Sequence, residues 1–86
     1  MYDVAWCTHW SAWHPGLAAI DVFEMALHAD DLDDAARMYA AERHHCYELQ
    51  IATSHIGWYL QTHDDHNLRL LNDGLNNMLR RGPRSV

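Results

Sequence analysis

Histidine is the residue type whose abundance first suggests chemistry in this chain. The 86 residues include eight His, two Cys and three Glu, and such side chains can bind metals or act in catalysis. Two zinc sites are conceivable from their order, namely Cys7 with His9 or His14 and with Cys46 or His45, and His63 and His66 with Asp64 or Asp65. Neither spacing is a known zinc signature, so we expect solvated or hydrogen-bonded histidines and no bound metal or other cofactor.

Paired carboxylates and histidines also occur at helical spacing. Glu42 and His45 form the E-x-x-H pair of di-iron bundles, but such a site needs the motif twice and two further Glu. His44 and Glu48 are four residues apart, which fits an ordinary surface ion pair. No glycine elbow, phosphate loop or catalytic signature frames a nucleophile. We therefore expect that the protein is not an enzyme, and keep a metal- or haem-binding bundle as an alternative.

Acidic residues are concentrated in the first part of the chain. Residues 1–34 hold seven Asp or Glu and no Arg, the chain has no Lys, and the net charge is -6. This composition does not neutralise phosphates, so direct nucleic-acid binding is not expected. Six of the acids fall within 14 residues and could dock on a basic surface of a partner protein: Asp21, Glu24, Asp30, Asp31, Asp33 and Asp34.

Tryptophan marks the beginning of the chain. Trp6, Trp10 and Trp13 follow steps of four and three residues, so a helix would place them on one side. They can fill the core, which is the usual role of aromatic side chains, or anchor a partner beside the acidic residues. Both interpretations stay open from the sequence.

The elements that position these residues are predicted to be helices, because apolar residues recur at three- and four-residue steps. Pro15 begins a helix at about 16–29, Asp30 or Asp31 caps a helix at about 33–61, and Thr62 begins one at about 64–81. The tryptophans lie on a short helix from about Asp3 to Trp13 or on an irregular arm. The fold class is all-α: a single domain over 1–86, a small bundle of three main helices, with a flexible tail at 82–86.

The long central helix is expected to need more than one neighbour. It would span roughly 44 Å at 1.5 Å per residue. Its predicted buried stripe is Ala35, Tyr39, Glu42, Cys46, Leu49, Thr53, Ile56 and Leu60. The two flanking helices could cover its halves, it could bend near Gly57, or a second copy could complete the coverage, and we expect a homodimer.

Together these features predict a non-catalytic, acidic protein-protein interaction module. It would cover a basic surface of its partner, as a phage-type inhibitor acting by nucleic-acid mimicry would. Two unpaired Cys, no export signal and no membrane segment favour the cytoplasm. A self-associating scaffold, with pairing set by Asn72, Asn76 and Asn77, is the other alternative.

Overall fold

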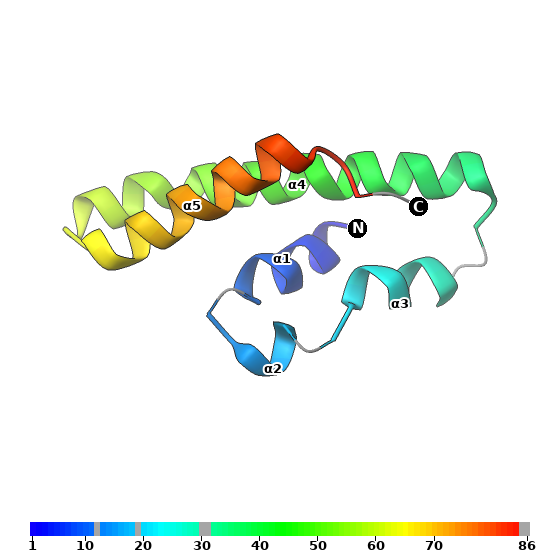
Figure 1. Ribbon diagram of the computed structural model, residues 1–86, viewed down its shortest axis with the longest axis horizontal. Coiled ribbons are helices and arrows are strands. Elements are labelled where there is room, and N and C mark those ends of the chain that lie inside the picture. The colour runs from blue at the N-terminus through cyan, green and yellow to red at the C-terminus, as the bar shows by residue number, and fades with distance from the viewer. Residues whose placement is uncertain (12, 19, 30–31, 85–86) are drawn as a thin grey trace.

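Five helices make up the computed structural model, which describes residues 1–11, 13–18, 20–29 and 32–84. They are α1 (Tyr2–Trp10), α2 (Pro15–Ala18), α3 (Val22–Ala29), α4 (Asp34–Gln61) and α5 (Asp65–Arg81), shown in Figure 1. The described ranges contain no strand. The predicted small all-α bundle is confirmed, and the tryptophan-rich beginning of the chain is a helix.

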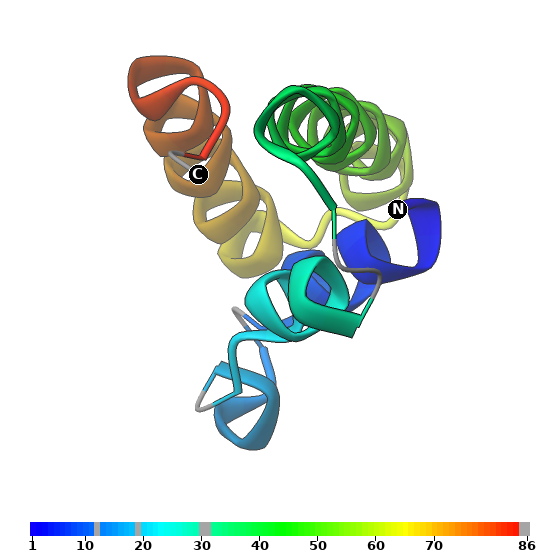
Figure 2. The same ribbon diagram turned by 90° about the vertical axis from the view of Figure 1, so that its right-hand side faces the viewer.

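Helix α4 is the longest element, and the others pack along it. The molecule measures 44 × 24 × 19 Å. Helix α5 folds back beside α4 after the turn that joins them, while α1 and α3 lie on another side of α4 (Figures 1 and 2). The helix continues through Gly57 without interruption. Of the expected ways to cover α4, the structure shows neighbouring helices on its two halves, and α1 contributes more than the sequence suggested.

Two apolar clusters hold these helices together. Near the beginning of α4, Phe23 and Leu27 of α3 pack against Ala40 and Ala41. Near its end, four buried side chains of α4 and α5 form the second cluster: Ala52, Tyr59, Leu71 and Leu75. Leu68, Leu71, Leu75 and Met78 recur at steps of three and four residues and form the face of α5 turned toward α4.

The predicted buried stripe of α4 was wrong. Most of its members are exposed, including Tyr39, Glu42, Cys46 and Leu60. The face that is buried carries small and polar side chains instead: Ala40, Ala41, His44, Glu48, Ile51, Ala52 and Tyr59. Both faces repeat at helical steps, and the buried one contains charged residue types that sequence reasoning places at the surface.

The helix predicted at 16–29 is interrupted and appears as α2 and α3. Asp21 is the reason, because its side-chain Oδ1 accepts a hydrogen bond from the backbone N–H of Glu24 at 3.1 Å. This is the bond of an N-cap residue, and it starts α3 at Val22.

Two other helix starts also differ from the sequence prediction. Asp33 caps α4 by accepting a 2.8 Å hydrogen bond from the backbone N–H of Ala36, whereas Asp30 and Asp31 lie outside the described residues. Asp64 caps α5, and the hydroxyl of Thr62, the expected cap, donates to the carbonyl of Trp58 at 2.9 Å. Gly82 ends α5 with φ of 68°, a conformation that glycine adopts without strain.

None of the described helices combines the length and the apolar character needed to cross a membrane.

Candidate functional site

The three tryptophans fix α1 against α4 and α5. All three are partly buried. Trp6 and Trp10 contact His55 of α4, with ring centroids 5.6 and 5.7 Å away. The indole N–H of Trp13 donates a 2.7 Å hydrogen bond to Oδ1 of Asn67 on α5. The tryptophans therefore have a structural role in joining the helices.

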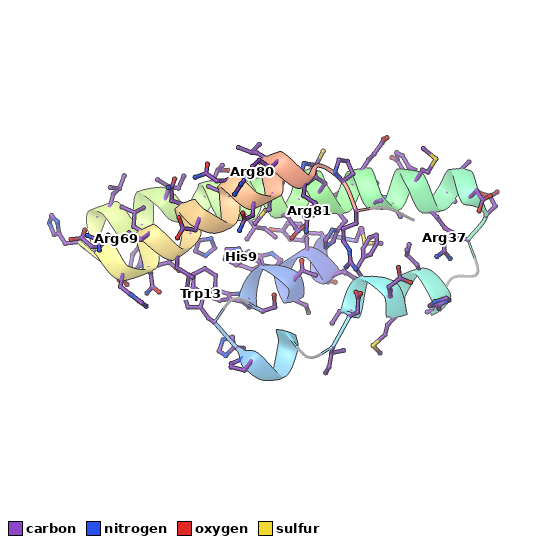
Figure 3. The ribbon with its side chains drawn as sticks, viewed as in Figure 1. His9, Trp13, Arg37, Arg69, Arg80 and Arg81 are labelled. Carbon is purple, nitrogen blue, oxygen red and sulfur yellow. The ribbon has the colours of Figure 1, made fainter. Side chains whose placement is uncertain are left out.

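His9 lies inside this aromatic cluster (Figure 3). His9 is only 3% exposed, and its ring stacks on that of His55 with centroids 4.9 Å apart. Its Nε2 has no hydrogen-bond partner among the residues that the structure describes. Burial, and secondarily the nearby His55, lower the pKa of His9 to about 4. His9 is therefore neutral at pH 7.

The four predicted acidic residues that the structure describes do not form one continuous cluster. Asp21 forms an ion pair with Arg84 at 2.7 Å, and Glu24 lies 3.5 Å from His28. Asp33 and Asp34 are exposed where α4 begins, beyond the other end of α3. Asp30 and Asp31 lie outside the described residues, so the structure places four of the six acids.

A pocket of about 540 Å³ opens among α1, α4, α5 and the beginning of α3. This volume is in the range of small-molecule sites. Its polar lining comes from segments far apart in the chain: Thr8, Ser11, Asp21, His44, Glu48, Asn77, Arg81 and Arg84. Arg84 belongs to the segment expected to be a flexible tail, and it joins that segment to α3 through Asp21.

The base of the pocket is a buried polar group on α4. His44 is 1% exposed and Glu48 is 5% exposed. His44 Nε2 lies 3.0 Å from the hydroxyl of Thr8, and His44 Nδ1 lies 3.1 Å from Glu48 Oε1. The second contact is short but poorly aligned for a hydrogen bond, which leaves Nδ1 without a good partner. The pair that the sequence suggested as a surface ion pair is therefore in the core.

Arg81 completes this group from α5. Its Nη2 donates to Glu48 Oε1 at 3.1 Å. Burial alone would raise the pKa of Glu48, but the contacts with His44 and Arg81 outweigh that effect and lower it. Glu48 is therefore an ionised carboxylate at neutral pH.

The hydroxyl of Thr8 is already engaged by its own helix. It donates a 3.0 Å hydrogen bond to the carbonyl of Ala5, so its oxygen is free to accept from His44 Nε2. The side chains around His44 are therefore fixed hydrogen-bond donors and acceptors. The Thr8 hydroxyl is not placed as a nucleophile, because its proton is donated to the carbonyl of Ala5.

Sequence reasoning noted the spacing of His44 and Glu48 but missed their burial. The available signal was their alignment with Ala40, Ala41, Ile51 and Ala52, which lie on the same side of an ideal helix. Small residues at these positions allow neighbouring helices to approach closely. Arg81 had no sequence signal beyond its place at the end of a helix, and Arg84 had none beyond its place just after it.

The described residues contain no group of three or more His, Cys, Asp or Glu side chains placed to hold a metal ion. Cys7 lines the pocket, and Cys46 is exposed. Both are free thiols.

The fold and these contacts define a small all-α bundle with a polar pocket built on its longest helix. Comparisons with known protein families, curated proteins and solved structures find no match for this chain. Its function is therefore inferred from its own side chains.

Proposed function

We propose that the protein is a non-catalytic interaction module whose acidic end docks on a basic surface of a partner protein. One observation carries the proposal: Asp33 and Asp34 are exposed at the start of α4, beside exposed apolar side chains. Met38 is 58% exposed and Tyr39 is 62% exposed. Asp34 and Met38 are four residues apart and share one side of the helix.

The electrostatic environment of this end supports a cationic partner. Arg37 is one turn further along α4, but the described residues include no salt bridge from it or from any other cation to Asp33 or Asp34. At 0.1 M ionic strength the electric field of such carboxylates decays over roughly 10 Å. Within that distance it speeds the approach of a basic surface and repels nucleic acid. A protein surface that normally holds nucleic acid has the required charge, and covering it would make this protein an inhibitor by mimicry.

Apolar contacts in this proposal come from Met38 and Tyr39, with Met25 of α3 as a further exposed side chain. Methionine suits a docking surface because its flexible thioether adapts to different shapes. Trp6, Trp10 and Trp13 are not part of this surface, because Trp6 and Trp10 contact His55, which lies roughly 30 Å from Asp34 along α4.

The test is affinity capture from the source cell with the unmodified protein and with the double variant Asp33→Asn, Asp34→Asn. Asn at position 33 can still cap α4, so the fold is retained while two charges are lost. We expect a captured protein with a basic surface to be lost, or strongly reduced, with this variant.

The start of α5 provides a matched control, because Asp64 and Asp65 occupy the same cap and first-turn positions there. The double variant Asp64→Asn, Asp65→Asn has the same net charge as the first variant. If both variants retain the partner equally, or if binding of the unmodified protein does not weaken with added salt, the proposal is wrong.

A further inference from the structure

The pocket above His44 and Glu48 has the size and polarity of a small-molecule site, independent of the acidic end. Its volume is about 540 Å³. Two of its lining side chains, His44 and Glu48, are almost completely buried, and the Nδ1 of His44 lacks a well-aligned partner. Burying polar groups costs stability unless they are paired. Such a cost at the base of a pocket indicates a role in binding.

The charges around the pocket are balanced. Arg81 is paired with Glu48 at 3.1 Å, and Arg84 is paired with Asp21 at 2.7 Å. A polyanion such as phosphate would meet two carboxylates, and a simple cation would meet two guanidinium groups. A ligand that carries one positive and one negative group matches both.

Each half of such a ligand finds unused hydrogen-bonding capacity. The described contacts of Glu48 both fall on Oε1, which leaves Oε2 as an acceptor for an ammonium group. Arg81 contacts Glu48 through Nη2 and Gly82 through Nε, so its Nη1 donors remain for a carboxylate. Arg84 uses Nη1 and Nη2 for Asp21 and keeps its Nε. Guanidinium groups are well shaped for carboxylate recognition.

The remaining lining is mixed, with Ser11 and Asn77 as polar members, and its apolar part fits a modest apolar side chain. Ile20, Val22 and Met78 contribute apolar surface to the same pocket. We propose that this pocket binds a free amino acid or a closely related small zwitterion, with its carboxylate on Arg81 and Arg84 and its ammonium group on Glu48.

The experiment measures binding of the common free L-amino acids to the full chain. Each is added at millimolar concentration in a thermal-shift assay, and those that raise Tm are titrated by calorimetry. We expect at least one to bind with 1:1 stoichiometry. Its N-acetyl derivative and its methyl ester, which lack one charge each, should bind at least tenfold more weakly.

Variants then assign the contacts. Arg84→Gln and Glu48→Gln should each weaken binding of the amino acid at least tenfold, because each removes one charged partner. Arg69→Gln is the matched control, since Arg69 is on α5 but does not line this pocket (Figure 3). Arg84 is at the rim, so its variant keeps the test valid even if Glu48→Gln unfolds.

Three outcomes would overturn the proposal. The first is the absence of any amino-acid binding up to about ten millimolar, a Kd that corresponds to a binding free energy of only about 3 kcal/mol. The second is equal binding of the N-acetyl derivative. The third is binding of inorganic phosphate in preference to every amino acid. The Asp33→Asn, Asp34→Asn variant should bind the amino acid normally. A failure of the docking proposal is thereby distinguished from a failure of this one.

Discussion

His9 makes the folded chain sensitive to acid. Burial lowers its pKa to about 4 in the folded state, whereas its ordinary value is 6.5. Between these values the unfolded chain binds more protons, so stability decreases as the pH falls. The full shift corresponds to roughly 3 kcal/mol. We expect the free energy of unfolding, measured by urea titration, to be constant above about pH 7 and to fall from there toward pH 4.

The variant His9→Phe separates this effect from other acid-sensitive groups. Phenylalanine fits an aromatic cluster and cannot titrate, so the decrease between pH 6.5 and 4.5 should be much smaller. Glu48 affects stability only at lower pH. Its pKa is lowered from 4.5, so its contribution to the free energy of unfolding is present above that pH and is lost below it. An unchanged pH profile in His9→Phe would show that His9 is not the group responsible.

Glu48 is the second residue whose role can be measured directly. Glu48→Gln removes the charge that faces His44 and Arg81 but keeps the side-chain size. Loss of charge-assisted hydrogen bonds in a buried site should lower the free energy of unfolding by about 2 kcal/mol. Glu42→Gln on the exposed side of α4 is the control and should change it by less than about 0.5 kcal/mol. Equal effects of the two variants would contradict the buried ion pair.

Helix boundaries are set by short-range contacts, and here the sequence predicted the elements better than their details. The turn at residues 62–64 and the end at Gly82 follow from local side chains, and those boundaries were close. Asp21 has the same capping chemistry as Asp33, but Ala, Leu and Phe on both sides of it look like one continuous helix. In the structure Asp21 both caps α3 and pairs with Arg84, which is 63 positions away and which no local pattern connects to it.

The buried face of α4 could not be predicted for a different reason. Its partners are α1, α3 and α5, and the surfaces of α1 and α5 include Thr8, the His9 ring and Arg81. Polar groups on the neighbouring helices lower the free-energy cost of burying His44 and Glu48. The residue periodicity of one helix does not indicate which side chains its neighbours will place against it. The acids at the start of α4 could be predicted because they are neighbours in the sequence. The pocket could not be predicted, because its lining comes from several segments that only the fold brings together.

The cap of α4 gives a prediction at the level of the element. Asp33→Ala removes the acceptor for the Ala36 backbone N–H and should lower the free energy of unfolding by about 1 kcal/mol. Asp33→Asn should lower it by much less, because an amide oxygen can accept the same hydrogen bond. Chemical denaturation of the two variants checks this. If Asn and Ala are equally destabilising, the charge of Asp33 matters more than its capping bond.

The molecule as a whole leaves one long face of α4 uncovered. Helices α1, α3 and α5 pack on the other sides. Among the described residues, the open face carries Tyr39, Cys46 and Leu60, the last 56% exposed. These residues belong to the stripe that the sequence suggested was buried. A second copy of the chain is the simplest partner that would bury it, since two identical helical faces can pair about a twofold axis.

Cys46 makes that pairing testable, because it lies close to the midpoint of α4 (Asp34–Gln61). In an antiparallel twofold pair, residues near the midpoint meet their own copies, so the two exposed Cys46 thiols would come within disulfide reach. We expect sedimentation at tens of micromolar to give twice the 10.0 kDa chain mass, and mild oxidation to give a linked dimer. Cys46→Ser should abolish the link and Cys7→Ser should not, because Cys7 lines the pocket. A monomer in sedimentation, or a link that survives Cys46→Ser, would show that this face of α4 does not pair with itself.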